Sequence, residues 1–227
     1  MRDVFHHELD QLAERLQAMT GLVGVAMGSA TRALLEADLR LAESVIADDA
    51  QVDEAQRDLD ERAVQILARQ SPVATDLRVV VASLRMSSSL ERMGDLARHV
   101  AALARLRYPR HAIPDSLRGT FAEMGDIGQR IAVKAGQVIA TRDLELAAEL
   151  ERDDDALDAL HRRTFQVLSS VEWAEAADTT ADVALASRYF ERFGDHAISV
   201  ARRVNFLVTG EYAPGTHSPG PELEPIG

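Results

Sequence analysis

The chain has 227 residues, of which 46% are hydrophobic and 27% charged, a composition typical of a soluble globular protein with one large domain or two small ones. It contains no cysteine, which excludes disulfides, thiolate metal sites and cysteine nucleophiles, and its formal net charge of −12 would repel a polyphosphate backbone, so we expect no nucleic-acid binding. The N-terminus lacks the apolar core of a signal peptide and no apolar run reaches the length of a membrane span, so we expect a cytoplasmic protein.

Helical periodicity continues through nearly the whole chain up to residue 207, because apolar residues recur at intervals of three and four. The first helix is predicted over about residues 3–35 and the second up to about residue 69. Pro72 is expected in the first turn of the third helix, where its missing N–H costs nothing, and this helix should end near Arg107.

A linker with two prolines spans residues 107–116 and separates the two halves of the chain. Asp115 or Ser116 is expected to cap the fourth helix, which should end near residue 140. The fifth helix is predicted from about residue 142 to 171, and the sixth from about residue 180 to 209, with Gly210 as its C-cap. Residues 211–227 are rich in Pro and Gly and are predicted to be disordered.

The chain contains an internal repeat. The stretch "LERMGDLARHVA" at residues 90–101 returns as "FERFGDHAISVA" at residues 190–201, and residues 37–55 align with residues 142–160. A repeat of this length indicates a duplicated three-helix unit. We therefore predict an all-α fold of two tandem, pseudo-symmetric three-helix bundles, with the first repeat at residues 1–108 and the second at residues 113–210.

Each repeat is predicted to bring four carboxylates to one level. A spacing of four places Glu91 and Asp95 on one face of the third helix. If the second and third helices form an antiparallel hairpin about Pro72, Asp53 lies level with Glu91 and Asp49 with Asp95. The same arithmetic applies in the second repeat to Asp154, Asp158, Glu191 and Asp195.

Four carboxylates at one level have two reasonable uses. One is metal binding, because oxygen-rich sites suit Mg²⁺, Mn²⁺, Ca²⁺ or iron. The other is pairing with arginine, because Arg92 and Arg192 adjoin the motif glutamates and Arg85, Arg98 and Arg188 lie within two turns. A solvated acidic face with salt bridges remains a plain alternative.

Four further residues adjoin these carboxylates. His99 follows Asp95 by one turn and is a further candidate ligand, although its counterpart in the second repeat is Ser199. Gly94 and Gly194 are predicted mid-helix, where glycine costs about 1 kcal/mol relative to alanine. Such a glycine points either to close approach of another helix or to room for the water shell of a metal.

Three segments carry a resemblance to a known family: "QSPVATDLR" at residues 70–78, "SSLERMGDLA" at 88–97 and "FERFGDHA" at 190–197. They resemble the signature segments of the PhoU family, the phosphate-uptake regulators of bacteria. The resemblance covers roughly residues 1–212 and implies the same pair of three-helix bundles.

The family carries Glu-x-x-x-Asp-x-x-x-Asp or Asn motifs that bind metal clusters in some members. The resemblance transfers the first two motif positions to Glu91 and Asp95 and to Glu191 and Asp195. It therefore implies binding of Fe, Zn, Mn or Mg. The third position departs from the motif, because His99 and Ser199 stand where Asp or Asn is usual.

The resemblance also implies a function: a non-catalytic adaptor between the ATPase of the phosphate ABC transporter and a phosphate-sensing histidine kinase. Such an adaptor represses the phosphate-starvation response when phosphate is sufficient, and homodimers are common among its relatives. Two other hypotheses stay open. A carboxylate-bridged metalloenzyme is disfavoured, because no histidine here has a glutamate three residues before it. A purely structural helical bundle is the third.

Overall fold

The computed structural model describes the backbone of residues 2–211 and the side chains of residues 7–211, so nearly all of the tail predicted to be disordered lies outside the described residues. Within that range the chain forms helices and no strands, which confirms the all-α prediction. The helices are α1 (Arg2–Glu36), α2 (Leu39–Gln70), α3 (Ala74–Arg107), α4 (Asp115–Thr141), α5 (Leu144–Leu168) and α6 (Ala177–Thr209).

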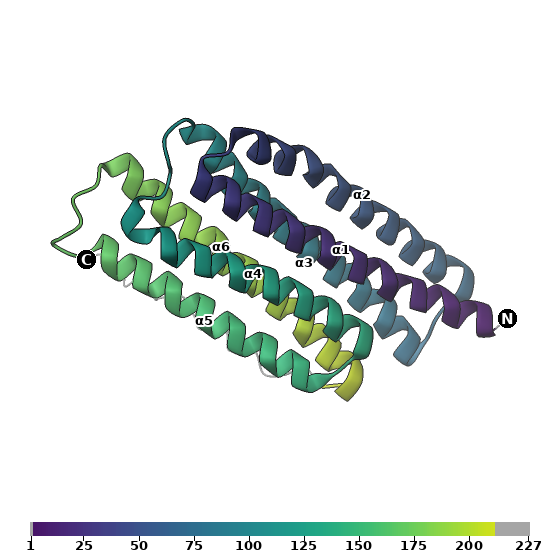
Figure 1. Cartoon of the computed structure of the whole chain (residues 1–227). Coiled ribbons are helices and arrows are strands. Elements are labelled where there is room, and N and C mark those ends of the chain that lie inside the picture. The colour runs from purple at the N-terminus through teal and green to yellow at the C-terminus, as the bar shows by residue number, and fades with distance from the viewer. Residues whose placement is uncertain (1, 212–227) are drawn as a thin grey trace, which may run out of the picture.

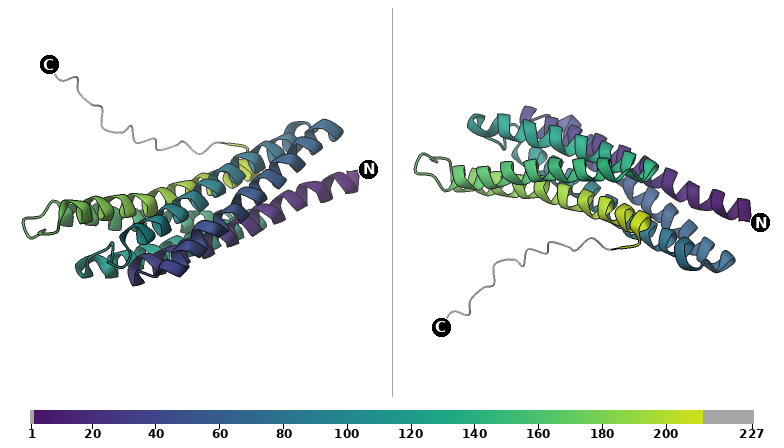
Figure 2. Two further views of the ribbon diagram at one scale, coloured as in Figure 1. Left: turned by 90° about the horizontal axis from the view of Figure 1, so that it is seen from above. Right: turned by 90° about the horizontal axis from the view of Figure 1, so that it is seen from below.

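The helices form two three-helix bundles that lie side by side. In Figure 1, α2, α1, α4 and α5 follow one another across the front, and α3 and α6 lie behind them. The bundles meet where α1 packs against α4 and where α3 packs against α6. Figure 2 shows the long axes running in roughly one direction, so each helix offers its whole length for packing.

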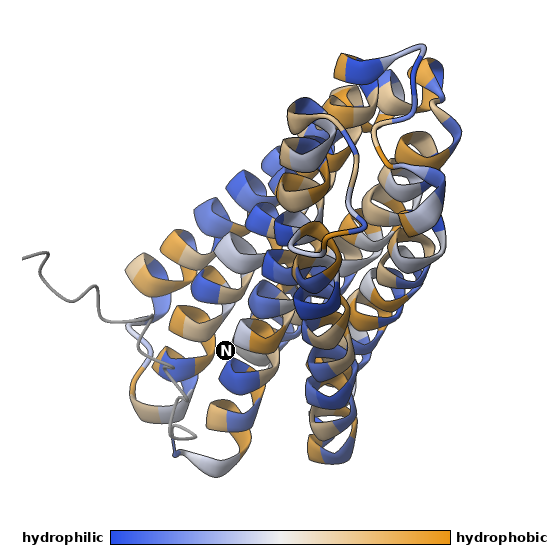
Figure 3. Cartoon of the chain, turned by 90° about the vertical axis from the view of Figure 1, so that its left-hand side faces the viewer, coloured by the Kyte–Doolittle hydropathy of each residue, from blue (hydrophilic) through white to orange (hydrophobic). Residues whose placement is uncertain are grey.

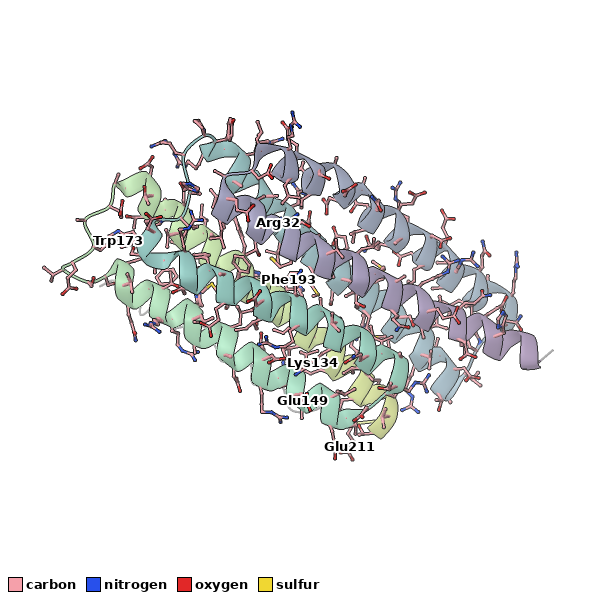
Figure 4. The ribbon with its side chains drawn as sticks, in the orientation of Figure 1. Arg32, Lys134, Glu149, Trp173, Phe193 and Glu211 are labelled. Carbon is pink, nitrogen blue, oxygen red and sulfur yellow. The ribbon has the colours of Figure 1, made fainter. Side chains whose placement is uncertain are left out.

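The core follows from the amphipathic pattern of the helices. Hydrophilic and hydrophobic turns alternate along the ribbons in Figure 3. The largest fully buried side chains include Phe121, Phe190 and Phe193, and Figure 4 places Phe193 in the middle of the molecule. Phe121 and Phe190 meet edge to face with ring centroids 6.0 Å apart, so aromatic contacts join α4 to α6.

Several helix ends differ from the sequence prediction. Pro72 precedes α3, which begins at Ala74, because the chain turns between two residues with positive φ angles, Ser71 (45°) after α2 and Ala74 (49°) at the first position of α3. Neither Asp115 nor Ser116 caps α4, since the N-cap residue is Pro114 and makes no side-chain cap bond. The predicted C-cap Gly210 is confirmed, with φ of 78°.

The fifth helix ends about three residues before its predicted end, and the sixth begins about three residues before its predicted start. α5 stops at Leu168 and α6 starts at Ala177. Trp173 lies in the turn between them and donates a hydrogen bond from Nε1 to Thr180 Oγ1 at 2.8 Å. This bond ties the turn to the first turn of α6, a link that residue periodicity cannot predict.

Helix α1 is apolar on more than one face. By length and composition alone, its segment His7–Glu36 could cross a membrane, which contradicts the expectation that no apolar run is long enough. Half of the apolar window is buried inside the protein, however, because α1 packs against α2, α3 and α4. A helix that is apolar nearly all round is equally typical of a protein core.

Helices α1 and α4 interlock through glycines that face threonines. A Cβ added to Gly125 would stand 2.7 Å from Thr31 Oγ1 and 2.9 Å from Thr31 Cβ. A Cβ on Gly136 would collide with Thr20 Oγ1. In the aligned repeats, Gly125 is the counterpart of Thr20 and Gly136 of Thr31. The first bundle therefore contributes both threonines and the second both glycines, and each threonine meets the glycine that aligns with the other threonine, across the pseudo-twofold axis.

We predict that Gly125→Ala destabilises the protein by about 1–3 kcal/mol, because Thr31 is branched at Cβ and cannot move aside. Helix propensity alone predicts the opposite sign, a gain of about 1 kcal/mol. Thermal or urea unfolding measures the difference. Gly119→Ala on the same helix is the control, since nothing lies within 4 Å of its added Cβ, and it should stabilise. Equal effects of the two variants would contradict the interlock.

Candidate cation site

The first bundle brings its four candidate carboxylates close together, and one arginine bridges two of them. Arg98 Nε lies 2.7 Å from Asp49 Oδ2, and Arg98 Nη2 lies 2.6 Å from Asp95 Oδ1. Arg98 therefore bridges α2 and α3. Asp53 and Glu91 lie close enough to Asp49 for their charges to interact. These residues therefore lie at the same height along α2 and α3, as their distances from the turn at Pro72 predicted.

A second arginine binds the outer side of the same cluster. Arg92 Nη1 lies 2.9 Å from Asp95 Oδ2, and Arg92 Nε lies 3.5 Å from Glu91 Oε2. Burial raises the pKa of Asp95, but the hydrogen bond and charge of Arg98, assisted by Arg92, outweigh this effect and lower it below its usual value. The cluster in the first bundle is therefore largely neutralised by side chains of α3 itself.

The second bundle assembles the equivalent carboxylates with less cationic support. Arg188 pairs with Glu191 Oε1, and Arg162 Nη1 lies 3.6 Å from Asp158 Oδ2. Among the described residues, Asp154 Oδ1 and Glu191 Oε2 are buried oxygens without a hydrogen-bond partner. A buried carboxylate oxygen without a partner is costly, and a cation is one way to relieve that cost.

The positive groups of α4 do not reach Asp154. Lys134 Nζ lies 2.8 Å from Asp153 Oδ2 and 3.1 Å from Glu149 Oε2, and Figure 4 shows Lys134 and Glu149 adjoining on α4 and α5. Arg130 also pairs with Asp153, at 3.3 Å. Asp153 is therefore neutralised, whereas its neighbour Asp154 faces other carboxylates.

Burial and the neighbouring carboxylates raise the pKa of Asp154 to about 7. Burial contributes most, and the negative charges of Asp158 and Asp195 add to it. Burial likewise raises the pKa of Glu191, with Asp195 adding to the shift. With a pKa of about 7, Asp154 is partly protonated at neutral pH unless a positive charge is brought to it.

The two motif glycines allow the close approach of helices that one sequence interpretation predicted. A Cβ on Gly94 would stand 3.1 Å from Val52 Cγ1 and 3.2 Å from Asp49 Oδ1. A Cβ on Gly194 would overlap Asp154 Oδ1 and lie 3.1 Å from Leu157 Cδ2. In each bundle the glycine thus leaves space for an aspartate carboxylate of the preceding helix.

One difference between the two clusters lies in a pair of aligned residues. Arg98 corresponds to Ile198 in the second repeat, so the second cluster has no guanidinium at the place where Arg98 bridges the first. The first cluster does not fit a metal ion as it stands, because Arg98 already holds two of its carboxylates. The second fits better, because it contains buried oxygens without partners. In neither cluster do three of these side chains already converge as metal ligands, within residues 7–211.

His99 and Ser199 occupy different surroundings. The His99 ring packs against Tyr189 of α6, with centroids 5.2 Å apart, and its Nε2 lies 3.5 Å from Arg98 Nη2. Ser199 donates a hydrogen bond from Oγ to the backbone oxygen of Asp195 at 3.1 Å. His99 therefore borders the seam between the bundles and the cationic side of the cluster, which gives no support to its predicted ligand role.

Sequence reasoning named Arg98 only as one of five arginines near the carboxylates. Comparing it with Ile198 in the aligned repeats would have singled it out. Reasoning from the sequence also missed the ion pairs that Arg107 makes across the bundle interface. Arg85, which the sequence grouped with the acidic motif, instead lines a separate groove between α3 and α6.

Comparisons with known proteins agree with this architecture. The sequence model of the PhoU domain matches residues 16–104 and 121–204, and these ranges contain all eight carboxylates. The chain is 47% identical over 212 residues to phosphate-specific transport system accessory protein PhoU homolog 2 of Mycobacterium tuberculosis, covering 93% of this chain and 100% of that protein. It is 34% identical to the PhoU homolog of Pseudomonas aeruginosa, with 91% and 86% covered.

Solved structures of PhoU proteins have the same fold as this chain. The crystal structure of PhoU from Pseudomonas aeruginosa superposes with a TM-score of 0.82 at 32% identity, covering 91% of this chain and 100% of that one. The phosphate transport system regulatory protein PhoU from Streptococcus pneumoniae also gives a TM-score of 0.82, with 92% and 99% covered. At 22% identity this second likeness supports the fold alone.

We predict that Asp154→Asn stabilises the protein above pH 7 by about 2 kcal/mol in the presence of a chelator, after allowance for solvent screening. The carboxyl group has a pKa of about 7 when folded, against 3.8 for an unperturbed aspartate. The folded protein therefore binds more protons than the unfolded one between these values, and wild-type stability falls as pH rises through this window. Asparagine cannot ionise, so the advantage of the variant should shrink towards pH 4.

Urea unfolding at a series of pH values tests this expectation. Asp126→Asn is the matched control, because Asp126 is an exposed aspartate on α4 and its removal should give no pH-dependent gain. A stability difference at Asp154 that stays constant with pH would contradict the proposed ionisation.

Proposed function

Because this chain belongs to the PhoU family, we propose that it is a regulator of phosphate uptake and signalling and not an enzyme. The observation that carries the proposal is the match over nearly the full length to proteins named phosphate-specific transport system accessory proteins. Those names denote accessory proteins rather than catalysts, which leaves the alternative of a carboxylate-bridged metalloenzyme without support.

The proposed mode of action is an adaptor in the cytoplasm. It would contact the ATPase of the phosphate ABC transporter and a phosphate-sensing histidine kinase, and repress the starvation response when phosphate is sufficient. The fold supports this proposal because six long helices present broad outer faces, and helix faces are a common mode of protein recognition. A homodimer is part of the same proposal.

Deletion of the gene tests the regulatory role. We expect the deletion strain to express phosphate-scavenging genes at high phosphate, because the repressing contact between transporter and kinase is lost. Reporter fusions to such genes measure the change, and a plasmid copy of the wild-type gene should restore repression. Normal repression at high phosphate in the deletion strain would refute the role.

We further propose that the acidic cluster of the second bundle, rather than that of the first, binds a metal ion. Asp154, Asp158, Glu191 and Asp195 would hold it, and Fe, Zn, Mn or Mg is the expected class, because such ions accept carboxylate ligands. When bound, the ion would supply positive charge among these carboxylates. The support is the pair of buried oxygens without a partner, Asp154 Oδ1 and Glu191 Oε2, together with Ile198 in place of a bridging arginine.

Titration with Mn²⁺ after removal of bound metal tests this assignment. We expect one ion per wild-type chain and loss of binding in the Asp154→Asn, Glu191→Gln double variant. Arg98→Ile makes the first cluster resemble the second and should raise the stoichiometry to two. The same double substitution in the first bundle, Asp49→Asn with Glu91→Gln, is the matched control and should leave one ion bound.

Two results would count against the metal proposal. No uptake of Mn²⁺, Zn²⁺, Mg²⁺ or iron, with a melting temperature unaffected by chelator, would favour a bundle with salt-bridged acidic faces. Equal loss of binding in both double variants would contradict the difference between the clusters.

A further inference from the structure

The outer face of α1 is apolar, although it is exposed at the surface. Between Arg15 and Arg32 this helix has no charged residue. Gly21 is exposed and Val25 is 68% exposed, and Val133 of the adjacent α4 is 59% exposed. In Figure 1, α1 lies between α2 and α4 on the front of the molecule. The middle of this side is therefore a strip without charge, on a protein whose net charge is −12.

Two grooves flank α1 on this side. One, of about 390 Å³, lies between α1 and α2, and the other, of about 560 Å³, lies between α1 and α4. Gly21 and Val25 line both, so the grooves adjoin along α1. Leu22 and Leu41 add apolar side chains to the first groove, and Val133 adds one to the second. The two grooves and the strip of α1 between them are called the α1 face below.

Gly21 differs from its neighbouring glycines on α1 in having no packing role within the chain. A Cβ on Gly24 would lie 3.1 Å from Ala132 Cβ, and a Cβ on Gly28 would overlap the Gln129 side chain. A Cβ on Gly21 would meet nothing within 4 Å among the described residues. Glycine in the middle of a helix is costly relative to alanine. At Gly21 this cost leaves the backbone of α1 open to close approach from outside the molecule.

Acidic side chains border both grooves. Asp48 lines the first groove and accepts hydrogen bonds from Ser44 Oγ at 3.1 Å and Gln51 Nε2 at 2.9 Å. Asp126 lines the second groove. Both aspartates are exposed. Within residues 7–211 neither has an arginine or lysine as an ion-pair partner, so each presents its charge to whatever covers the groove.

The other charged groups in the lining are already paired. Arg130 lines the second groove and lies 3.3 Å from Asp153. Asp49 of the first acidic cluster reaches the first groove, but Arg98 holds its carboxylate at 2.7 Å. The charge that the α1 face offers to another molecule is therefore negative, around an apolar centre.

This combination selects the occupant. A second copy of the chain in a two-fold dimer would bring the acidic border against itself. Residues 212–227 contain two glutamates and no lysine or arginine, so they carry the same sign. An anionic membrane surface would also be repelled. A helix of another protein, with apolar residues on one face and basic residues beside them, matches both the grooves and their border.

We propose that the α1 face docks a basic amphipathic helix of a partner protein. Its apolar side chains fill the two grooves, its backbone passes close to Gly21, and its lysines or arginines pair with Asp48 and Asp126. The proposal deepens the adaptor role proposed above, and rests on it only in requiring that the protein acts by binding other proteins.

Fluorescence anisotropy of a labelled synthetic peptide tests the docking on the full chain at physiological ionic strength. The probe is an alanine-rich helical peptide with leucines along one face and lysines on both sides of them. The comparison peptide has the same lysines, with glutamine in place of each leucine. We expect the leucine peptide to bind at least about tenfold more tightly, because its apolar side chains leave water on docking.

Gly21→Gln tests the contact at the centre of the α1 face. We expect it to weaken binding of the leucine peptide at least about tenfold, because the new side chain occupies the place where the two grooves meet. Gly119→Gln is the matched control, since an added Cβ there also meets nothing within 4 Å and Gly119 lines neither groove. It should bind the peptide as the wild type does, and melting curves should show that both variants remain folded.

Asp48→Lys tests the acidic border. We expect weaker binding of the leucine peptide, because an attraction becomes a repulsion. Glu61→Lys makes the same change in net charge at an exposed position of α2 outside the groove, and should leave binding nearly unchanged.

Three results would overturn the docking. One is unchanged peptide binding in either Gly21→Gln or Asp48→Lys. The second is self-association of the wild type that Gly21→Gln abolishes, which would assign the α1 face to a second copy. The third is binding of the wild type to vesicles of phosphatidylcholine and phosphatidylglycerol that Gly21→Gln abolishes, which would assign it to a lipid surface.

The peptide assay and the gene-deletion assay fail separately. Peptide binding with normal phosphate repression in the deletion strain would retain the docking surface and refute the regulatory role. Lost repression in the deletion strain with no peptide binding would retain the role and refute the docking surface.

Discussion

The reciprocal contact of Thr20 with Gly136 and of Thr31 with Gly125 determines how the two bundles are joined. Because each threonine fills the space that a glycine leaves, α1 and α4 pack closely and antiparallel along the pseudo-twofold axis. This packing fixes α3 against α6 on the other side and holds the two acidic hairpins, α2–α3 and α5–α6, apart. The position of the two acidic clusters relative to each other therefore depends on this close approach.

The internal repeat predicted most of the fold, because aligned segments form the same three-helix unit. Which residues lie level with one another on two antiparallel helices then follows from the position of the turn between them. It correctly placed Asp49 and Asp95 at one level. It failed at helix ends such as that near Pro72, where the turn from α2 into α3 uses positive φ angles at Ser71 and Ala74. Periodicity contains no information on such backbone angles.

The roles of charged side chains were harder to predict than their level on the helices. The sequence placed five arginines near the carboxylates, but side-chain geometry decides that Arg98 bridges two helices while Arg85 lines another groove. The ion pairs of Arg107 join residues more than seventy positions apart. Only packing across the pseudo-twofold axis brings such partners together.

Arg98 has a consequence for the way the two bundles respond to their surroundings. A guanidinium that is part of the chain cannot be removed by a chelator, exchanged for another ion or diluted. The ion pairs of Arg98 therefore join α2 to α3 without any added ion. The two repeats therefore differ in how their hairpins are joined: Arg98 bridges α2 and α3, whereas Ile198 leaves the α5–α6 hairpin without an equivalent bridge.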